Sequence, residues 1–82
     1  MANTKRDTIR YTMRDGNKIV KFGVTDRLEQ RERENQAELG SDLKLRKEGP
    51  KVTRDSALDW ESGKIEDYER RNGEKPPGNA QK

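Results

Sequence analysis

The 82-residue sequence contains no cysteine and no histidine. Without cysteine there is no disulfide framework, no thiolate nucleophile and no thiolate metal site. Without histidine the chain lacks the commonest general base and the commonest ligand of transition metals. Any chemistry must therefore use carboxylate, phenol, amine, guanidinium or hydroxyl groups. Any bound metal is expected to be a hard, oxygen-preferring ion such as Mg²⁺.

Long apolar runs are also absent. No stretch of the sequence approaches the roughly 20 apolar residues that a membrane-spanning helix needs. The first residues, Met1 to Arg6, lack the apolar core of a signal peptide. We therefore expect a soluble intracellular protein, located in the cytoplasm, that has no membrane partner.

Strong core-forming residues are scarce. Only 26% of the chain is hydrophobic and 43% is charged, and Leu, Ile, Val and Phe together account for 12 of the 82 residues. Such a share is typical of disordered chains when the net charge is also high. Here the net charge is only +3, because 19 Lys and Arg face 16 Asp and Glu. At this length we expect one small domain at most.

Two strand-like segments surround a turn signal near the N-terminus. Residues 8–14 alternate polar with apolar side chains, and Tyr11 lies on the apolar face. Residues 18–24 are rich in β-branched and aromatic side chains. Between them, Asp15-Gly16 favours a tight turn because glycine accepts a positive φ. The pattern predicts a β-hairpin.

Helix and strand signals alternate along the rest of the chain. Helix-favouring runs begin after residues that can cap a helix and end at glycine, and a short alternating segment lies between them. The predicted elements are a helix that Thr25 or Asp26 caps and that ends at Gly40, a strand over 42–47, and a helix from Thr53 to about Arg71.

The expected fold is α+β, with a small three-stranded antiparallel sheet flanked by helices, in the order strand, strand, helix, strand, helix. We expect a flexible N-terminus over residues 1–7, a single domain over 8–73 and a C-terminal tail over 74–82. The tail cannot be helical where it contains two consecutive prolines.

Polar side chains occupy helix positions that a core would fill with apolar residues. Arg31 and Asn35 lie between the two leucines of the first helix's stripe, and Glu61 lies in the middle of the second helix's stripe. Because burying an unpaired charge is costly, three interpretations stay open. Arg31 and Glu61 form a structural ion pair, both lie at the rim of narrow stripes, or both line a polar cleft. The second stripe is expected to comprise Ala57, Leu58, Ile65 and Tyr68.

Motifs of a nuclease family fall on the same residues. The tripeptides Ile9-Arg10-Tyr11 and Lys21-Phe22-Gly23 lie where the family has its two tripeptides, and a Gly-x-Thr-x-x-Leu-x-x-Arg run leads from Gly23 through Thr25 to Arg31. Downstream, an Ala-x-x-x-Glu-x-x-x-Ile pattern contains Glu61, and Asn79 matches a closing asparagine. Over about residues 8–79 the chain resembles the GIY-YIG nuclease domain.

The resemblance implies hydrolysis of a DNA phosphodiester bond with one Mg²⁺ or Mn²⁺ ion. Glu61 would be the only protein ligand of the ion, and Arg31 would stabilise the charge of the transition state. Tyr11 would orient or deprotonate the attacking water. Asn79 would pack back on the domain.

Three positions depart from the family pattern. Ile9 replaces the first tripeptide's glycine, Lys21 replaces the second tripeptide's tyrosine, and Asn35 stands where histidine is common. Lys21 could supply the lost hydrogen bond, act as a base, or bind phosphate in a site that no longer cuts. Asn35 could bind phosphate but cannot shuttle protons.

Basic residues on the predicted strands suggest a phosphate-binding patch, although strand cations also serve to solubilise a sheet and protect its edges. The patch residues besides Lys21 are Arg10, Arg14, Lys18, Lys44, Arg46 and Lys47. Trp60 and Tyr68 are expected to be core residues and not base-stacking platforms.

Three functions remain open: a DNA endonuclease, a noncatalytic member of the same fold that binds nucleic acid or a processing partner, and a protein-binding adaptor. Homodimerisation is compatible with each.

Overall fold

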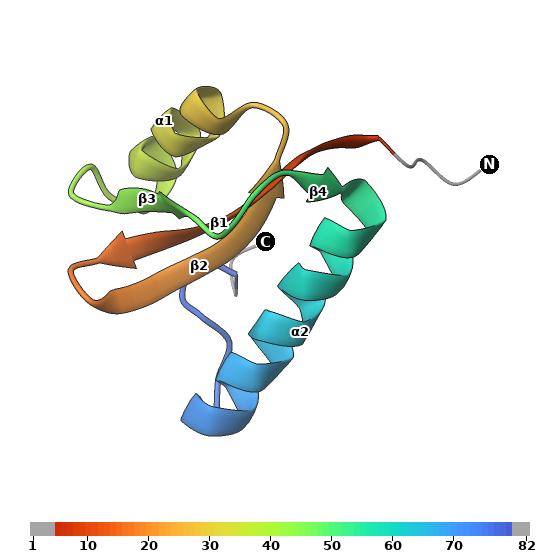
Figure 1. Cartoon of the computed structure of the whole chain (residues 1–82). Helices are drawn as coiled ribbons and strands as arrows, with labels where there is room; N and C mark the ends of the chain where they lie inside the picture. The colour runs from red at the N-terminus through yellow and green to blue at the C-terminus, as the bar shows by residue number, and fades with distance from the viewer. Residues whose placement is uncertain (1–4, 80–82) are drawn as a thin grey trace.

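An antiparallel sheet lies between the two helices, with α1 on one face and α2 on the other (Figure 1). The computed structural model describes residues 5–79 of the chain. The elements in order are β1 (Arg6–Asp15), β2 (Lys18–Thr25), α1 (Leu28–Leu39), β3 (Lys44–Lys47), β4 (Val52–Thr53) and α2 (Arg54–Asn72). The predicted α+β class and antiparallel sheet are confirmed. None of the helices in residues 5–79 is long and apolar enough to cross a membrane.

β1 is the central strand of the sheet. It pairs with β2 along one side, while β3 and β4 pair with successive parts of its other side. The two-residue β4 was not predicted, because so short a segment has no detectable period. Since Arg6 pairs with Thr53 of β4, residues 6 and 7 belong to the sheet and not to a flexible terminus. Residues 1–4 lie outside the described part of the chain.

The hairpin prediction is confirmed. β1 and β2 pair antiparallel around a turn in which Gly16 has a φ of 61°, the conformation that glycine adopts without steric cost. An irregularity between Met13 and Arg14 shifts the register. With this register, Tyr11 lies opposite Gly23 and Thr12 lies opposite Phe22. Because side chains alternate along a strand, the first pair faces α1 and the second pair faces α2.

Each face of the sheet has its own packing cluster. On the α1 side, the fully buried Tyr11 and Met13 pack with Leu43. On the α2 side, the Phe22 ring makes edge-to-face contacts with Trp60 and Tyr68, with centroids 5.8 and 6.4 Å apart. Trp60 and Tyr68 therefore pack against the sheet, but both rings remain half-buried, so the prediction that they are core residues holds only in part.

The predicted stripe of α2 is wrong at Leu58, which is 39% exposed. α2 approaches the sheet through the fully buried Ala57 and through Trp60. One residue further along a helix the side chain turns by about 100°, which carries Leu58 away from the sheet.

The two helices begin differently. The Thr53 hydroxyl accepts a hydrogen bond from the Ser56 amide at 3.2 Å, which confirms the predicted cap of α2. The predicted cap of α1 is wrong, because Arg27 is the N-cap residue and no side chain caps that helix. Thr25 still belongs to β2, and its hydroxyl accepts a hydrogen bond from the Arg27 amide at 2.9 Å. It thus shapes the connection before the helix.

The C-terminal segment returns to the outer edge of β2 (Figure 1). The Asn79 side chain accepts a hydrogen bond from the Phe22 amide at 2.8 Å and donates one to the Phe22 carbonyl at 2.9 Å. The Gly78 amide donates to the Val20 carbonyl at 2.7 Å. These contacts satisfy backbone groups that an edge strand would leave open, and they show that Asn79 does pack back on the domain.

Replacing Asn79 with Ala is expected to lower the free energy of unfolding by about 1–3 kcal/mol, because both backbone groups of Phe22 lose their partner. Chemical denaturation followed by circular dichroism measures the change. Lys75→Ala serves as the control, since Lys75 is exposed in the same segment. Equal stability of the two variants would contradict the proposed anchoring of the edge.

Candidate functional site

Three of the predicted site residues form a chain of hydrogen bonds on the α1 face of the sheet. The Asn35 amide nitrogen donates to the Tyr11 hydroxyl at 3.0 Å, and the Lys21 ammonium donates to the Asn35 amide oxygen at 3.0 Å. Asn35 is only 1% exposed and Tyr11 is equally buried. β1, β2 and α1 each contribute one residue to this relay, which we call the Tyr11 relay.

The direction of the Tyr11 relay follows from its chemistry. A lysine ammonium can only donate hydrogen bonds, so the Asn35 oxygen must face Lys21 and the Asn35 nitrogen must face Tyr11. The Tyr11 oxygen is consequently an acceptor in this contact. Its own hydrogen has no acceptor among the described residues.

Gly23 makes room for the Tyr11 ring. The two residues are paired across β1 and β2, and a Cβ atom at position 23 would collide with the phenol ring. The motif glycine is therefore explained by a close approach of a side chain to the backbone. Thr25, two residues later, is buried and bonds to the Arg27 amide, which directs the chain into α1.

Burial raises the pKa of the Tyr11 phenol above its ordinary value. The Asn35 hydrogen bond and the positive charge of Arg31 oppose this shift, while the negative charges of Glu61 and Glu34 add to it. Arg31 and Glu61 therefore lie within electrostatic range of the phenol. At neutral pH the Tyr11 hydroxyl keeps its proton.

Glu61 is half-buried on α2, and its burial raises the pKa of its carboxyl. The nearby positive charges of Lys21 and Arg54 oppose the shift. The sequence analysis missed Arg54, although its spacing of seven residues, two helical turns, places it on the same face of α2 as Glu61.

Arg31 lies at the rim of the site. Its guanidinium contacts Glu34 at 3.5 Å, and its side chain is 46% exposed. The interpretation of a structural ion pair between Arg31 and Glu61 is thus wrong, because the described carboxylate partner of Arg31 is one helical turn away on α1. Glu34 was also missed by the sequence analysis, although the spacing of three residues on a helix could have indicated it.

A polar hollow of about 230 Å³ borders Arg31, at the junction between the end of β2 and the start of α1. Its lining residues are Thr25, Asp26, Arg27, Gln30, Arg31 and Glu34. Since Arg31 is exposed into this hollow, its guanidinium can reach a charged group arriving from solvent. The arrangement fits the interpretation of an open polar cleft for Arg31 and is compatible with a rim position.

Glu61 is the metal ligand that the resemblance implies. In residues 5–79, no group of three or more acidic, histidine or cysteine side chains could hold a metal ion. Mg²⁺ commonly keeps several waters and binds one or two carboxylates together with substrate phosphate oxygens. The Glu61 carboxylate has no hydrogen-bond or ion-pair partner within the described residues, and its raised pKa means that a nearby cation would stabilise its charged form. Glu61 therefore fits a single hydrated ion.

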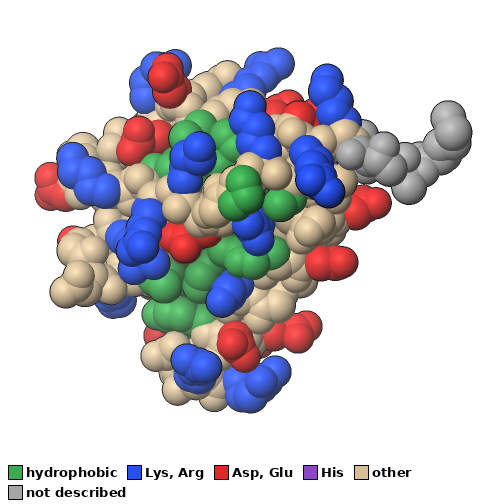
Figure 2. Space-filling model, viewed as in Figure 1, with side chains coloured by type: hydrophobic (Ala, Val, Ile, Leu, Met, Phe, Trp, Pro, Cys, Tyr) green, Lys and Arg blue, Asp and Glu red, His purple; other side chains and the backbone are tan. Residues whose placement is uncertain are grey.

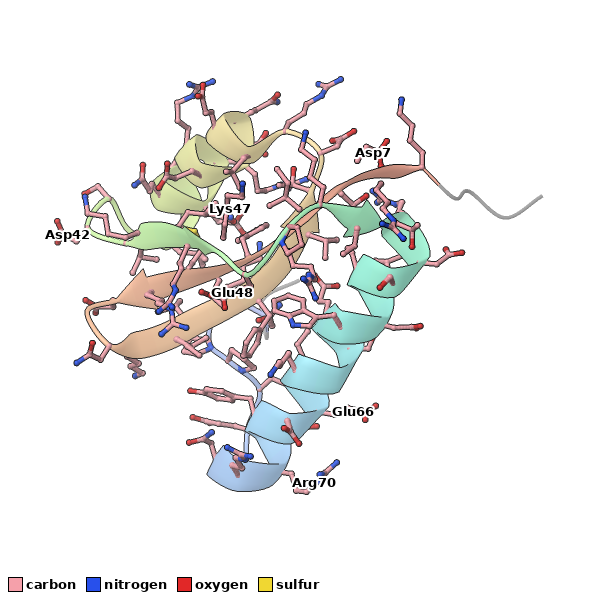
Figure 3. All side chains as sticks on the ribbon, viewed as in Figure 1. Asp7, Asp42, Lys47, Glu48, Glu66 and Arg70 are labelled. Atoms are coloured by element: carbon pink, nitrogen blue, oxygen red, sulfur yellow. The ribbon has the colours of Figure 1, made fainter. Side chains whose placement is uncertain are left out.

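The predicted basic patch is divided between the two faces of the sheet. The Arg10 guanidinium lies 5.9 Å from the Trp60 ring centroid, and Arg14 donates from Nε to Thr12 at 3.0 Å, both on the α2 side. Arg14 and Arg46 also approach Glu48, at 3.6 and 3.7 Å. Figure 3 labels Glu48 in the segment between β3 and β4.

The predicted lysines are exposed but dispersed. Lys47 lies opposite Tyr11 in the register and so belongs to the α1 side, whereas Lys44 lies opposite Arg14 on the α2 side (Figure 3 labels Lys47). Lys18 stands beside the hairpin turn. A single nucleic acid strand on one face of the sheet could therefore contact only part of the predicted set.

The sequence matches no protein-family model, and neither the curated proteins nor the solved structures include a significant match.

Proposed function

We propose that the protein is a small metal-dependent endonuclease of the GIY-YIG type, which hydrolyses DNA phosphodiester bonds. The supporting observation is the hydrogen-bonded Tyr11 relay, built from β1, β2 and α1, together with Arg31 and Glu61, whose charges act on the Tyr11 phenol. In a domain with so few core-forming residues, burying polar groups is costly unless they are paired, so polar side chains at these positions favour a chemical role.

In the proposed reaction a water oxygen attacks phosphorus and releases its proton to solvent, and the bond between phosphorus and the leaving oxygen breaks as that oxygen takes up a proton from solvent. The transition state carries extra negative charge on the phosphate oxygens, which a planar guanidinium stabilises well. Arg31 supplies this group from the rim of the site. A Mg²⁺ ion at Glu61 would polarise the phosphate and stabilise the leaving oxygen.

Tyr11 acts in this scheme as a hydrogen-bond donor. Because its pKa is raised, the phenol is neutral at neutral pH and a poor acceptor of the water's proton. Its free hydrogen can instead orient the attacking water or bind a phosphate oxygen. Of the two roles that the family resemblance implies for Tyr11, orientation is therefore the one supported.

Lys21 replaces the missing tyrosine as a donor. Its ammonium fixes Asn35 and also acts electrostatically on Glu61. It is therefore placed to bind phosphate while holding the Tyr11 relay in position.

A noncatalytic phosphate-binding function is the second candidate. The observation that favours it is that Lys21, Asn35 and Arg31 all present donors around Tyr11. Such a site can hold a phosphate without providing a base. The two candidates differ in whether bound DNA is cut.

Arg31→Ala is expected to lower the rate of DNA cleavage by about 10²–10³-fold while leaving the fold intact, because Arg31 is exposed and contributes little to packing. Supercoiled, nicked and branched DNA, each incubated with Mg²⁺ or Mn²⁺, are the substrates. Arg33→Ala is the matched control, since Arg33 is an exposed arginine on the same helix.

Absence of cleavage by the wild-type protein on every substrate would overturn the endonuclease proposal. DNA mobility shifts that weaken steeply with salt would then support the noncatalytic candidate. If no shift occurs even at low salt, both candidates fail and a protein-binding role remains.

A further inference from the structure

A second cavity lies on the opposite face of the sheet from the Tyr11 relay. It has a volume of about 390 Å³, within the range of small-molecule sites, and lies between the sheet and the C-terminal half of α2. Aromatic side chains of Phe22, Trp60 and Tyr68 form its apolar part. Figure 2 shows hydrophobic side chains open to solvent on the face viewed, with Lys and Arg side chains around them.

The aromatic walls have a defined geometry. Phe22 meets Trp60 with ring planes at 82° and meets Tyr68 with ring planes at 75°. In both pairs the rings therefore meet edge to face. Since Trp60 and Tyr68 are only half-buried, part of each ring surface remains available to a planar ligand, while Arg10 lies over the Trp60 ring, 5.9 Å from its centroid.

Positive charge exceeds negative charge around this cavity. Its cations are Arg14, Lys64 and Arg71, and its carboxylates are Glu48 and Asp67. Both carboxylates are already engaged, Glu48 by Arg14 and Asp67 by Arg71. Lys64 forms no ion pair with any described residue, so an anion at the rim would find an unneutralised ammonium.

We infer that this cavity binds a nucleotide, with the base against Trp60 and Tyr68 and the phosphate near Lys64 and Arg71. Bases stack favourably on aromatic side chains whatever their sequence, and ammonium and guanidinium groups are the usual phosphate partners. Neither the base nor the phosphate would touch Tyr11, Arg31 or Glu61. The inference is therefore independent of the proposed cleavage.

Adenosine 5′-monophosphate is the probe, titrated into the full chain without divalent metal. Trp60 is the only tryptophan, so its fluorescence reports directly on the cavity. We expect a saturable change, while inorganic phosphate and adenosine each bind at least about fivefold more weakly because each lacks one of the two contacts. A parallel titration with a single-stranded oligonucleotide tells whether a nucleotide within a strand also fits.

Arg71→Ala is expected to weaken binding by about fivefold or more. Its matched control is Arg70→Ala, because Arg70 also contacts Asp67, at 3.3 Å, but does not line the cavity. Figure 3 shows Arg70 pointing away from the sheet. Arg71 is 79% exposed, so its loss leaves the fold intact.

Tyr68→Ala is expected to weaken binding to a similar degree, with circular dichroism verifying that the variant folds. The inference is overturned if the Trp60 signal does not saturate up to about 10 mM nucleotide, which corresponds to an affinity too weak for a built site. It is also overturned if Arg70→Ala weakens binding as much as Arg71→Ala, or if phosphate alone binds equally well. A fluorescence change that depends on protein concentration and not on nucleotide would assign the cavity to self-association instead.

Discussion

Glu61→Gln is expected to lower the rate of metal-dependent DNA cleavage by about 10³-fold. The proposed metal ion would lower the free energy of the charged transition state by several kcal/mol. Each 1.36 kcal/mol in the activation free energy corresponds to a factor of ten in rate. Glutamine keeps the shape of the side chain but removes the negative charge that would hold the cation.

The same substitution is expected to raise the melting temperature by a few degrees at pH 8. Burial raises the folded-state pKa of Glu61 above its unfolded value, so the native state holds its proton to a higher pH than the unfolded state does. Below the pKa of Glu61 in the unfolded state, this proton contributes fully to the stability of the fold. The contribution is lost as the pH rises through the pKa of Glu61 in the folded state. Above that window the wild-type protein carries an unfavourable charge that glutamine lacks.

Cleavage rates and melting curves between pH 4 and pH 9, about the range that spans carboxyl titration, measure both effects. Glu66→Gln is the matched control, because Glu66 is an exposed glutamate on the same helix and points away from the sheet (Figure 3). Full cleavage by Glu61→Gln would remove Glu61 from metal binding. A melting temperature below that of the wild type at pH 8 would contradict the raised pKa.

Opposite signs of the two effects would identify Glu61 as a residue kept for function. A purely structural glutamate would lose stability when its charge is removed. Stability given up for activity is a common property of functional sites, and it accounts for a polar residue at a position that the helical pattern reserves for the core.

Local signals were sufficient to predict much of the fold. The alternation of 8–14, the Asp15-Gly16 turn and the cap at Thr53 each depend on near neighbours in the sequence, and each is confirmed. β4 and the start of β1 at Arg6 escaped prediction because they stabilise each other across the sheet. Contacts between residues that are distant in the sequence produce no hydrophobic periodicity in either segment.

The helix pattern also located part of the candidate site. Asn35 is buried as its stripe position indicates, because partners on β1 and β2 satisfy its amide. Arg31 is exposed despite a similar position, because its long side chain reaches the rim and meets Glu34. Periodicity gives the direction of a side chain, but its length and its partners decide whether the polar end is buried.

The division of the basic residues illustrates a further limit. Lys44 and Lys47 belong to one short strand but face opposite helices, because side chains alternate and the register pairs Lys47 with Tyr11. The sequence shows that the strands are basic. Only the register shows that their cations do not form one surface.

Asn35→Ala is expected to lower the free energy of unfolding by about 2–4 kcal/mol and to abolish cleavage. Its amide serves both Tyr11 and Lys21, and Asn35 is 1% exposed. Each buried polar group left without a partner costs about 1–3 kcal/mol. Since this variant affects stability and chemistry together, a second substitution is needed to separate them.

Asn35→Asp separates the two. A carboxylate still accepts from Lys21, but it cannot donate to the Tyr11 hydroxyl. The phenol would then turn its own hydrogen toward residue 35, and that hydrogen would no longer be available to water or phosphate. We expect this variant to retain more stability than Asn35→Ala, while its cleavage rate falls by about 10²-fold, a typical loss for one oriented donor.

Denaturation curves and cleavage rates of the two variants, with Asn17→Asp at the exposed hairpin turn as control, test the orientation of the Tyr11 relay. If Asn35→Asp folds and cuts DNA at the wild-type rate, the Tyr11 hydrogen is not needed by the substrate. The relay would then serve only to satisfy buried polar groups. If stability is retained and cleavage is lost, the proton of Tyr11 must point into the site, as the donor-only chemistry of Lys21 requires.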